Sequence, residues 1–286
     1  MDRAARIESR SFSKTWVVLT AGLLASGSCS GEDSATATIC DGSNAIRFSF
    51  RNIGGGSVLP GSQVLGENGS NFLIVDGQCH FWALENEYSD VRAGNLTDSQ
   101  ENSLSTALRL SSWRELRGDY TDSLCDGPTR EYRFAGSKIA VYSACGGGSS
   151  PVSWLLNPAL SQLQAIYDNG TPIDGPVRVV LVSEPADAFW PTWWIDNSVR
   201  WPSTTDPKSI ALTYDQASNY QRGSSVLVMP SDADALRSAR RSFVEKNGPQ
   251  ITGGLLPVLG PMDERYDCFA RDSISLEDAL GLLNLD

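Results

Sequence analysis

The sequence is poor in histidine, and this scarcity excludes several enzyme classes. His80 is the only histidine among 286 residues. Zinc peptidases with the H-E-x-x-H motif need two histidines on one helix, so that class is excluded. A Ser-His-Asp triad needs a G-x-S-x-G turn or an equivalent around its serine, and no such motif occurs. A Cys79-His80 dyad is not expected either, because neighbours on a strand point to opposite faces.

Other catalytic and cofactor motifs are also missing. No two cysteines have C-x-x-C spacing, which excludes a zinc ribbon and a thioredoxin-like motif. The glycine-rich runs at 54–56 and 146–148 are not followed by Gly-Lys-Ser/Thr, so we interpret both as loops rather than phosphate-binding sites. The single S-x-x-K match, at 11–14, lies in the expected leader. From these absences we predict no metal and no cofactor, and we favour a protein that is not an enzyme.

The only long apolar run lies near the N-terminus. Residues 16–25 are apolar, follow a basic and polar segment at 1–15, and precede the small residues 26–28. This order is that of a secretory signal peptide. Ten residues rise ~15 Å as a helix, which is too short to cross a bilayer core of ~30 Å. We therefore predict a signal peptide over residues 1–28 and export of the remainder.

The end of this leader resembles a lipoprotein lipobox. Small residues precede Cys29, and the polar segment SGEDSATAT that follows is typical of a flexible tether. The resemblance to bacterial surface lipoproteins implies acyl chains such as palmitate on Cys29 and a tether over residues 29–39. It also implies a membrane anchor at the periplasmic or outer surface of the cell envelope. The usual pattern has a Leu-like residue where Ser26 stands, so ordinary cleavage after Gly27 or Ser28 is the alternative.

Basic residues are scarce beside acidic ones. The chain has 23 Lys and Arg against 34 Asp and Glu. The expected leader contains four of the basic and two of the acidic residues, which leaves 19 against 32 in the exported part. Such a surface repels phosphate backbones, so nucleic acid is not an expected partner. The acidic excess is consistent with solubility outside the cell.

Cysteine usage predicts disulfide bonds, because an exported chain folds in an oxidising compartment. Cys125 and Cys145 flank a stretch with strand character and are the best-placed pair, and Cys40 with Cys79 is the next. If Cys29 is lipidated, five cysteines remain and one must be unpaired. Cys268 is then the candidate, whereas without lipidation all six can pair.

Hydrophobic periodicity predicts an α+β body over residues 40–286. Strands are expected at 44–52, 131–134, 138–143, 177–182 and 224–229, with a hairpin over 72–84 that turns at Asp76-Gly77. Helices are expected over 97–110, from Asn157-Pro158 to about residue 167, over 231–246, and from Ser275. This irregular mixture indicates a mainly antiparallel sheet with about four helices. The Pro- and Trp-rich region 184–208 is where a boundary between two lobes would fall.

Two features suggest binding or catalysis. Exposed tryptophans can stack on sugar rings, and the candidates are Trp190, Trp193, Trp194 and Trp201. Tryptophan is usually largely buried, so packing in the core or between lobes is the alternative. The second feature is a set of acidic loops, namely Asp168/Asp174, Asp187, Asp232/Asp234 and Asp263/Glu264. Two carboxylates ~5–9 Å apart can hydrolyse a glycoside, and several can bind calcium.

We therefore expect a membrane-anchored exported lipoprotein whose body is a non-catalytic binding or envelope-structural module. Its expected partners are the membrane, through the lipid anchor, and a glycan or an envelope protein. The alternative is a carboxylate-based glycoside hydrolase or another polysaccharide-acting enzyme.

Overall fold

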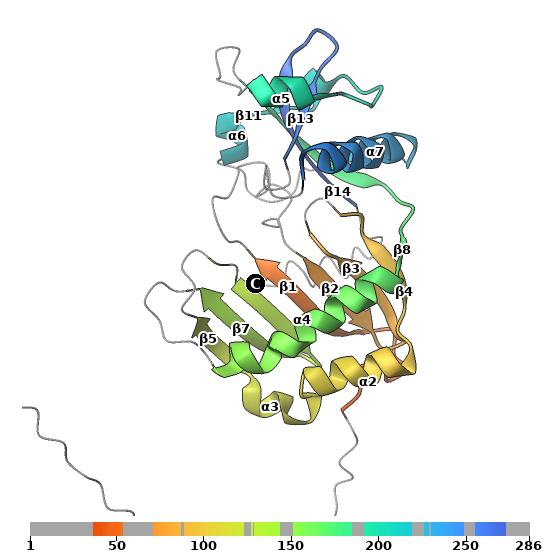
Figure 1. Ribbon diagram of the computed structural model, residues 1–286, viewed down its shortest axis with the longest axis vertical. Coiled ribbons are helices and arrows are strands. Elements are labelled where there is room, and N and C mark those ends of the chain that lie inside the picture. The colour runs from red at the N-terminus through yellow and green to blue at the C-terminus, as the bar shows by residue number, and fades with distance from the viewer. Residues whose placement is uncertain are drawn as a thin grey trace, which may run out of the picture. The chain divides into compact units, whose positions relative to one another are not determined.

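The computed structural model has an α+β fold with two mainly antiparallel sheets, as the sequence predicts (Figure 1). The described residues are 37–53, 71–86, 89–122, 127, 129–143, 151–184, 192–218, 226–228, 230–248 and 255–272. The predicted signal peptide, Cys29, most of the tether and the helix expected from Ser275 lie outside these ranges. Within them, no helix is long and apolar enough to cross a membrane.

Sheet A contains eight strands in the order β5-β7-β6-β1-β2-β3-β4-β8. Neighbouring strands pair antiparallel, except that β5 and β7 are parallel. The predicted strands in this region and the 72–84 hairpin are confirmed. The strands are β1 (Ile46–Ile53), β2 (Phe72–Asp76), β3 (His80–Leu84), β4 (Arg92–Asn95), β5 (Gly118–Asp122), β6 (Thr129–Phe134), β7 (Ser137–Ser143) and β8 (Thr171–Pro172).

The β2–β3 turn forms where Asp76-Gly77 predicts it. The Asp76 carboxylate accepts hydrogen bonds from the backbone N–H of Gln78 (2.9 Å) and of His80 (2.8 Å), which closes the turn. Gly77 is needed there because Asp41 and Ser43 occupy the space that a Cβ atom would take. The turn therefore packs directly against the segment that precedes β1.

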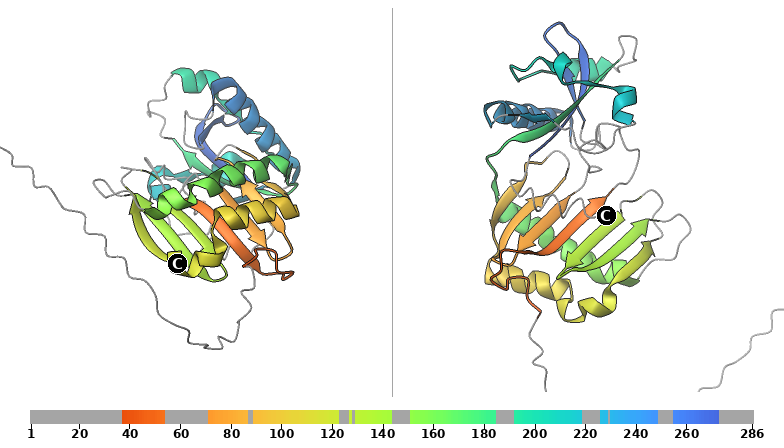
Figure 2. Two further views of the ribbon diagram at one scale, coloured as in Figure 1. Left: turned by 60° about the horizontal axis from the view of Figure 1, so that its bottom comes forward. Right: turned by 180° about the vertical axis from the view of Figure 1, so that it is seen from behind.

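Two helices, α2 (Asp98–Ala107) and α4 (Pro151–Asn169), lie side by side on one face of sheet A (Figures 1 and 2). The short helices η1 (Leu110–Ser112) and α3 (Trp113–Leu116) follow α2. Thr97 caps α2 in the predicted capping box: its Oγ1 accepts from Gln100 N–H, and its own N–H donates to Gln100 Oε1. The apolar core of this part lies between the helices and the sheet.

Helix α4 begins earlier than predicted. We expected Asn157 as its cap and Pro158 in its first turn, but α4 starts at Pro151 and contains Pro158 inside. An internal proline removes one backbone hydrogen bond and costs ~3 kcal/mol. The turn before it carries Leu156, which is fully buried against the core, and this burial offsets the cost.

Sheet B follows the order β10-β13-β14-β9-β11, with β12 also paired to β9. Its strands are β9 (Val177–Ser183), β10 (Val199–Arg200), β11 (Leu212–Thr213), β12 (Val226–Val228), β13 (Leu255–Leu259) and β14 (Arg265–Asp272). Antiparallel β14 lies between β13 and β9, while β10 pairs parallel with β13 and β11 parallel with β9. The carboxyl ends of β9, β10, β11 and β13 therefore meet at one edge of the sheet.

Helix α7 (Pro230–Asn247) packs on one face of sheet B, and the short α6 (Tyr214–Ser218) packs on the other. The predicted strands at 177–182 and 224–229 and the helix at 231–246 are confirmed. Region 184–208 contains α5 (Thr192–Asn197) and η2 (Pro207–Ser209) and connects strands of one sheet. The chain passes from sheet A to sheet B at residues 173–176, where it leaves β8 and enters β9.

A buried ion network ties the segment before β4 to β14 and α7. Asp272 accepts the backbone N–H of Val91 at 2.8 Å and pairs with Arg237 Nε at 2.6 Å. Arg240 pairs with Asp90 at 2.6 Å and lies 3.5 Å from Asp272. The two arginine side chains and Asp272 are at most 5% exposed. The network joins residues that are up to 181 positions apart in the chain.

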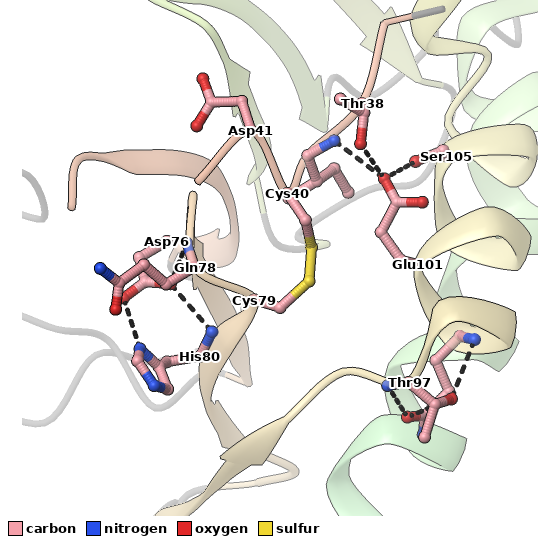
Figure 3. The surroundings of a disulfide bond; sticks show 12 residues. Thr38, Cys40, Asp41, Asp76, Gln78, Cys79, His80, Thr97, Glu101 and Ser105 are labelled. Carbon is pink, nitrogen blue, oxygen red and sulfur yellow. Dashed lines mark hydrogen bonds and ion pairs between the residues drawn. A yellow bond between two sulfur atoms is a disulfide. The ribbon is translucent and has the colours of Figure 1, made fainter. Parts of the chain in front are cut away.

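A disulfide joins Cys40 to Cys79 and fixes the N-terminal segment to the β2–β3 hairpin (Figure 3). Glu101 of α2 holds the same segment, because its Oε1 accepts hydrogen bonds from Thr38, Ile39 N–H and Ser105. This bridge is one of the two predicted pairs. The other predicted pair, Cys125 with Cys145, lies outside the described residues, and Cys268 is buried with a free thiol.

Candidate ligand pocket

A cavity of about 550 Å³ lies at the carboxyl edge of sheet B, and we call it the sheet-edge pocket. Thr213 of β11 is paired with Ser183 of β9, and both strands end beside the β13–β14 turn. Ligands of sheets with parallel strands bind where the carboxyl ends of those strands diverge. The pocket is lined by Ser183, Glu184, Lys208, Ala211, Thr213, Met262, Asp263, Glu264, Arg265 and Tyr266.

A positioned ion pair forms one wall of the pocket. Lys208 Nζ lies 2.6 Å from Glu264 Oε1, while Glu264 Oε2 accepts the backbone N–H of Met262 at 3.0 Å. The hydrogen bond from Lys208 lowers the pKa of Glu264 and raises that of Lys208. Asp206 caps η2 by accepting a hydrogen bond from the Lys208 backbone N–H, and this bond holds the backbone of Lys208 in place. The pocket wall therefore presents a positive ammonium group and a negative carboxylate group in fixed positions.

A second ion pair holds the β13–β14 turn at the pocket rim. Arg200, at the end of β10, lies 2.5 Å from Asp263 and donates to the carbonyl oxygen of Gly260 at 3.0 Å. The turn closes through the backbone hydrogen bond from Gly260 N–H to Glu264 O. Both side chains of this ion pair are exposed, so it adds little stability by itself. Its role is to restrict the loop that carries Met262 and Glu264.

Two carboxyl groups meet behind this edge. Asp267 of β14 is opposite Val182 of β9, and Glu184 lies two residues beyond Val182 on the same face. Burial raises the pKa of Asp267 to about 8, and the hydrogen bond with Glu184 and the charge of Glu184 add to the shift. Asp267 is therefore mostly protonated at pH 7. Of the two acids, only Glu184 lines the pocket.

The predicted tryptophan site is described only in part. Trp190 lies outside the described residues, and Trp193 and Trp194 belong to α5, where their side chains are not described. Trp201 packs against the core of sheet B and donates its Nε1–H to the carbonyl oxygen of Thr205 at 2.7 Å. This side chain thus follows the packing alternative.

The predicted acidic loops divide in the structure. Asp263 and Glu264 line the sheet-edge pocket, whereas Asp232 accepts a hydrogen bond from Ser203 and Asp234 pairs with Arg237. Asp168 accepts a hydrogen bond from the Gln164 side chain on α4, and Asp187 lies outside the described residues. Across the described ranges, no group of three or more His, Cys, Asp or Glu is arranged to hold a metal ion.

Sequence reasoning missed Glu184, Lys208 and Asp267. A signal for Glu184 exists, since it directly follows the apolar strand 177–183. A signal for Asp267 also exists, because this acid interrupts the apolar residues of β14. Lys208 has no local signal, because only the folding of η2 beside the β13–β14 turn brings it to Glu264.

The one histidine lies away from the sheet-edge pocket. His80 Nδ1 is 3.0 Å from Asp76 Oδ2, its side chain is 46% exposed, and the neighbouring Cys79 is in the disulfide (Figure 3). These partners leave no thiol for a Cys-His dyad. The sheet-edge pocket is therefore the site on which the functional proposal is built. Comparison of the chain with protein-family models, with curated proteins and with solved structures gave no match.

Proposed function

We propose that the protein is an exported lipoprotein, anchored through Cys29 at the cell envelope, whose body binds an envelope glycan fragment in the sheet-edge pocket. The leader pattern and its resemblance to a lipobox support the anchor. The Cys40–Cys79 disulfide is consistent with an oxidising compartment.

The observation that carries the binding proposal is the combination of fixed charge and apolar surface on one cavity. Lys208 and Glu264 offer a donor and an acceptor in fixed positions. Met262 on the rim is 73% exposed, and the aromatic residue Tyr266 also lines the cavity. Sugars combine hydroxyl groups with apolar ring faces, and aromatic and thioether side chains suit those faces. A cavity of this size is also within the usual range for small-molecule sites.

Calorimetric titration of the purified full chain with a panel of peptidoglycan and other envelope glycan fragments tests the binding. We expect Lys208→Ala to weaken binding at least about tenfold, since it removes a charged hydrogen-bond donor from the pocket. Lys138→Ala is the matched control, because Lys138 is a similarly exposed lysine on sheet A. Absence of binding to every fragment, or equal losses in both variants, would contradict the proposal.

The anchor is tested separately by mass spectrometry of the processed N-terminus. A diacylglyceryl modification on Cys29 is the expected result. An unmodified N-terminus at Ser28 or Cys29 would refute lipidation and leave ordinary secretion.

A carboxylate-based glycoside hydrolase is the second candidate, and it is favoured by two acids, Glu184 and Glu264, that line one pocket. Asp267 is buried and does not line the pocket, so it is not the second carboxyl group of such a pair. Release of new reducing ends from an envelope glycan, lost in Glu184→Gln, would support the hydrolase. Binding without turnover would favour the first candidate.

A further inference from the structure

The carboxyl groups of Glu184 and Asp267 are placed together by the register of sheet B. Asp267 lies on the central strand β14, and its side chain is on the face that carries Val182 and Phe269. Asp267 Oδ1 is fully buried, and no N–H or O–H donor of a described residue reaches it. The register places Glu184 diagonally across from Asp267 on this face, and a hydrogen bond with the Glu184 carboxyl group contributes to the raised pKa of Asp267. Two carboxyl groups can share a hydrogen bond only if one of them carries a proton.

The other groups around Asp267 do not supply that proton. On β13, the residue opposite is Pro257, which has no N–H and no titratable side chain. Arg265 lies two residues away on the same face of β14, and α6, which packs on this face, carries the exposed Asp215. Beyond them, the pocket holds the Lys208–Glu264 ion pair.

We propose that Glu184 and Asp267 hold one proton between them, and that loss of this proton loosens the inner wall of the sheet-edge pocket. The proton leaves Asp267 for solvent and leaves two carboxylates facing each other. Like charges at hydrogen-bonding distance repel strongly inside a protein. The strain falls on the end of β9 and the start of β14, because Glu184 directly follows β9 and Asp267 is the third residue of β14.

The sign of the pH effect follows from proton counting. Asp267 keeps its proton in the folded protein up to a pKa of about 8, whereas in the unfolded chain its pKa lies near the ordinary aspartate value of 3.8. Between these values the folded state binds more protons than the unfolded state, so stability falls as pH rises. One proton raises the unfolding constant by at most tenfold for each pH unit, or up to about 100-fold between pH 6 and pH 8.

Infrared spectroscopy of the full chain tests the shared proton. We expect a protonated carboxylic acid band at pH 6 that disappears by pH 9 and is absent from Asp267→Asn. Glu184→Gln should also lose the band, since its amide can donate to an ionised Asp267 and replace the proton. Absence of the band from the wild type at pH 6, or its persistence in Asp267→Asn, would overturn the proposal. The pH dependence of the wild-type band and the loss of the band in Glu184→Gln keep the test decisive if Asp267→Asn does not fold.

Loosening is tested by urea unfolding and by amide hydrogen exchange at pH 6 and pH 9. Wild type and Asp119→Asn, the control with an exposed acid on sheet A, should lose stability with rising pH, while Asp267→Asn should not. Exchange in β9 and β14 should be faster in the wild type than in Asp267→Asn at pH 9. Equal exchange rates, or equal pH slopes in all three proteins, would overturn the coupling. Neither readout uses a ligand, so the result is independent of the proposed binding function.

Discussion

Replacing Asp272 by asparagine should destabilise the protein far more than replacing Asp234, although both acids pair with Arg237. Asp272 binds Arg237 Nε at 2.6 Å and is fully buried, while Asp234 binds Arg237 NH1 at 3.0 Å and is 74% exposed. Arg237 also donates to the carbonyl oxygen of Gly175 at 2.7 Å. Each substitution therefore removes one carboxylate partner of the same arginine, Asp272 from a buried site and Asp234 from an exposed one.

The expected magnitude comes from what each substitution leaves behind. Burial lowers the pKa of Arg237, but the charge and the hydrogen bond of Asp272 outweigh this effect, and the net pKa is raised. Asp272→Asn leaves Arg237 and Arg240 buried without their shared carboxylate. Removing one partner of a buried ion pair costs ~3–5 kcal/mol. Asparagine keeps an oxygen for the Val91 N–H, so the lower end of this range, about 3 kcal/mol, is expected.

The control substitution should cost much less. An exposed ion pair contributes ~0–1 kcal/mol, so Asp234→Asn should change the free energy of unfolding by less than about 1 kcal/mol. Urea denaturation at pH 7, followed by tryptophan fluorescence and by circular dichroism, gives both values. If the two variants lose the same stability, or if Asp272→Asn loses under about 1 kcal/mol, the network does not hold the fold as argued.

Two further predictions concern the N-terminal segment. The double variant Cys40→Ser/Cys79→Ser should lose about 4 kcal/mol, because the disulfide spans a sequence separation of 39 residues; a urea midpoint unchanged from the oxidised wild type would contradict this. Burial raises the pKa of Glu101, but hydrogen bonds from Thr38, Ile39 and Ser105 lower it by more, so the net pKa is below the unfolded value of 4.5. The ionised Glu101 therefore stabilises the fold above pH 4.5, and this stabilisation is lost as pH falls through the lowered pKa. Glu101→Gln should therefore destabilise the protein more at pH 7 than at pH 3, and equal losses at both values would refute this account.

Elements that depend on near neighbours in the sequence were predicted well. Strand β1 follows from the alternation of Ile46, Phe48 and Phe50, and its buried face contains these last two residues. The start of α2 follows from Thr97 and Gln100, which lie three residues apart and bind each other's backbone. In both cases the pattern and its physical cause lie within a few residues.

Elements that depend on distant partners were not predicted. Strand β13 is a short apolar run that contains Pro257, and a proline in such a run argues against a central strand. It forms a strand because β10 and β14 pair on its two sides. Strands β10 and β11 each have two residues, too few to show any period. The sheet-edge pocket could not be predicted for the same reason, since its walls come from three separate segments of the chain.

The two acids within β14 show why residue type alone does not predict a role. Asp272 faces the side covered by α7, where Arg237 and Arg240 neutralise it. Asp267 lies five residues earlier, and an odd separation on a strand places it on the opposite face. Its hydrogen-bonding partner there is Glu184, another acid, so it keeps a proton instead of forming an ion pair. The first arrangement stabilises the fold, whereas the second costs stability as pH rises and lies behind a pocket. Local violations of folding rules concentrate at functional sites, and this contrast directs the search for function to Glu184 and Asp267.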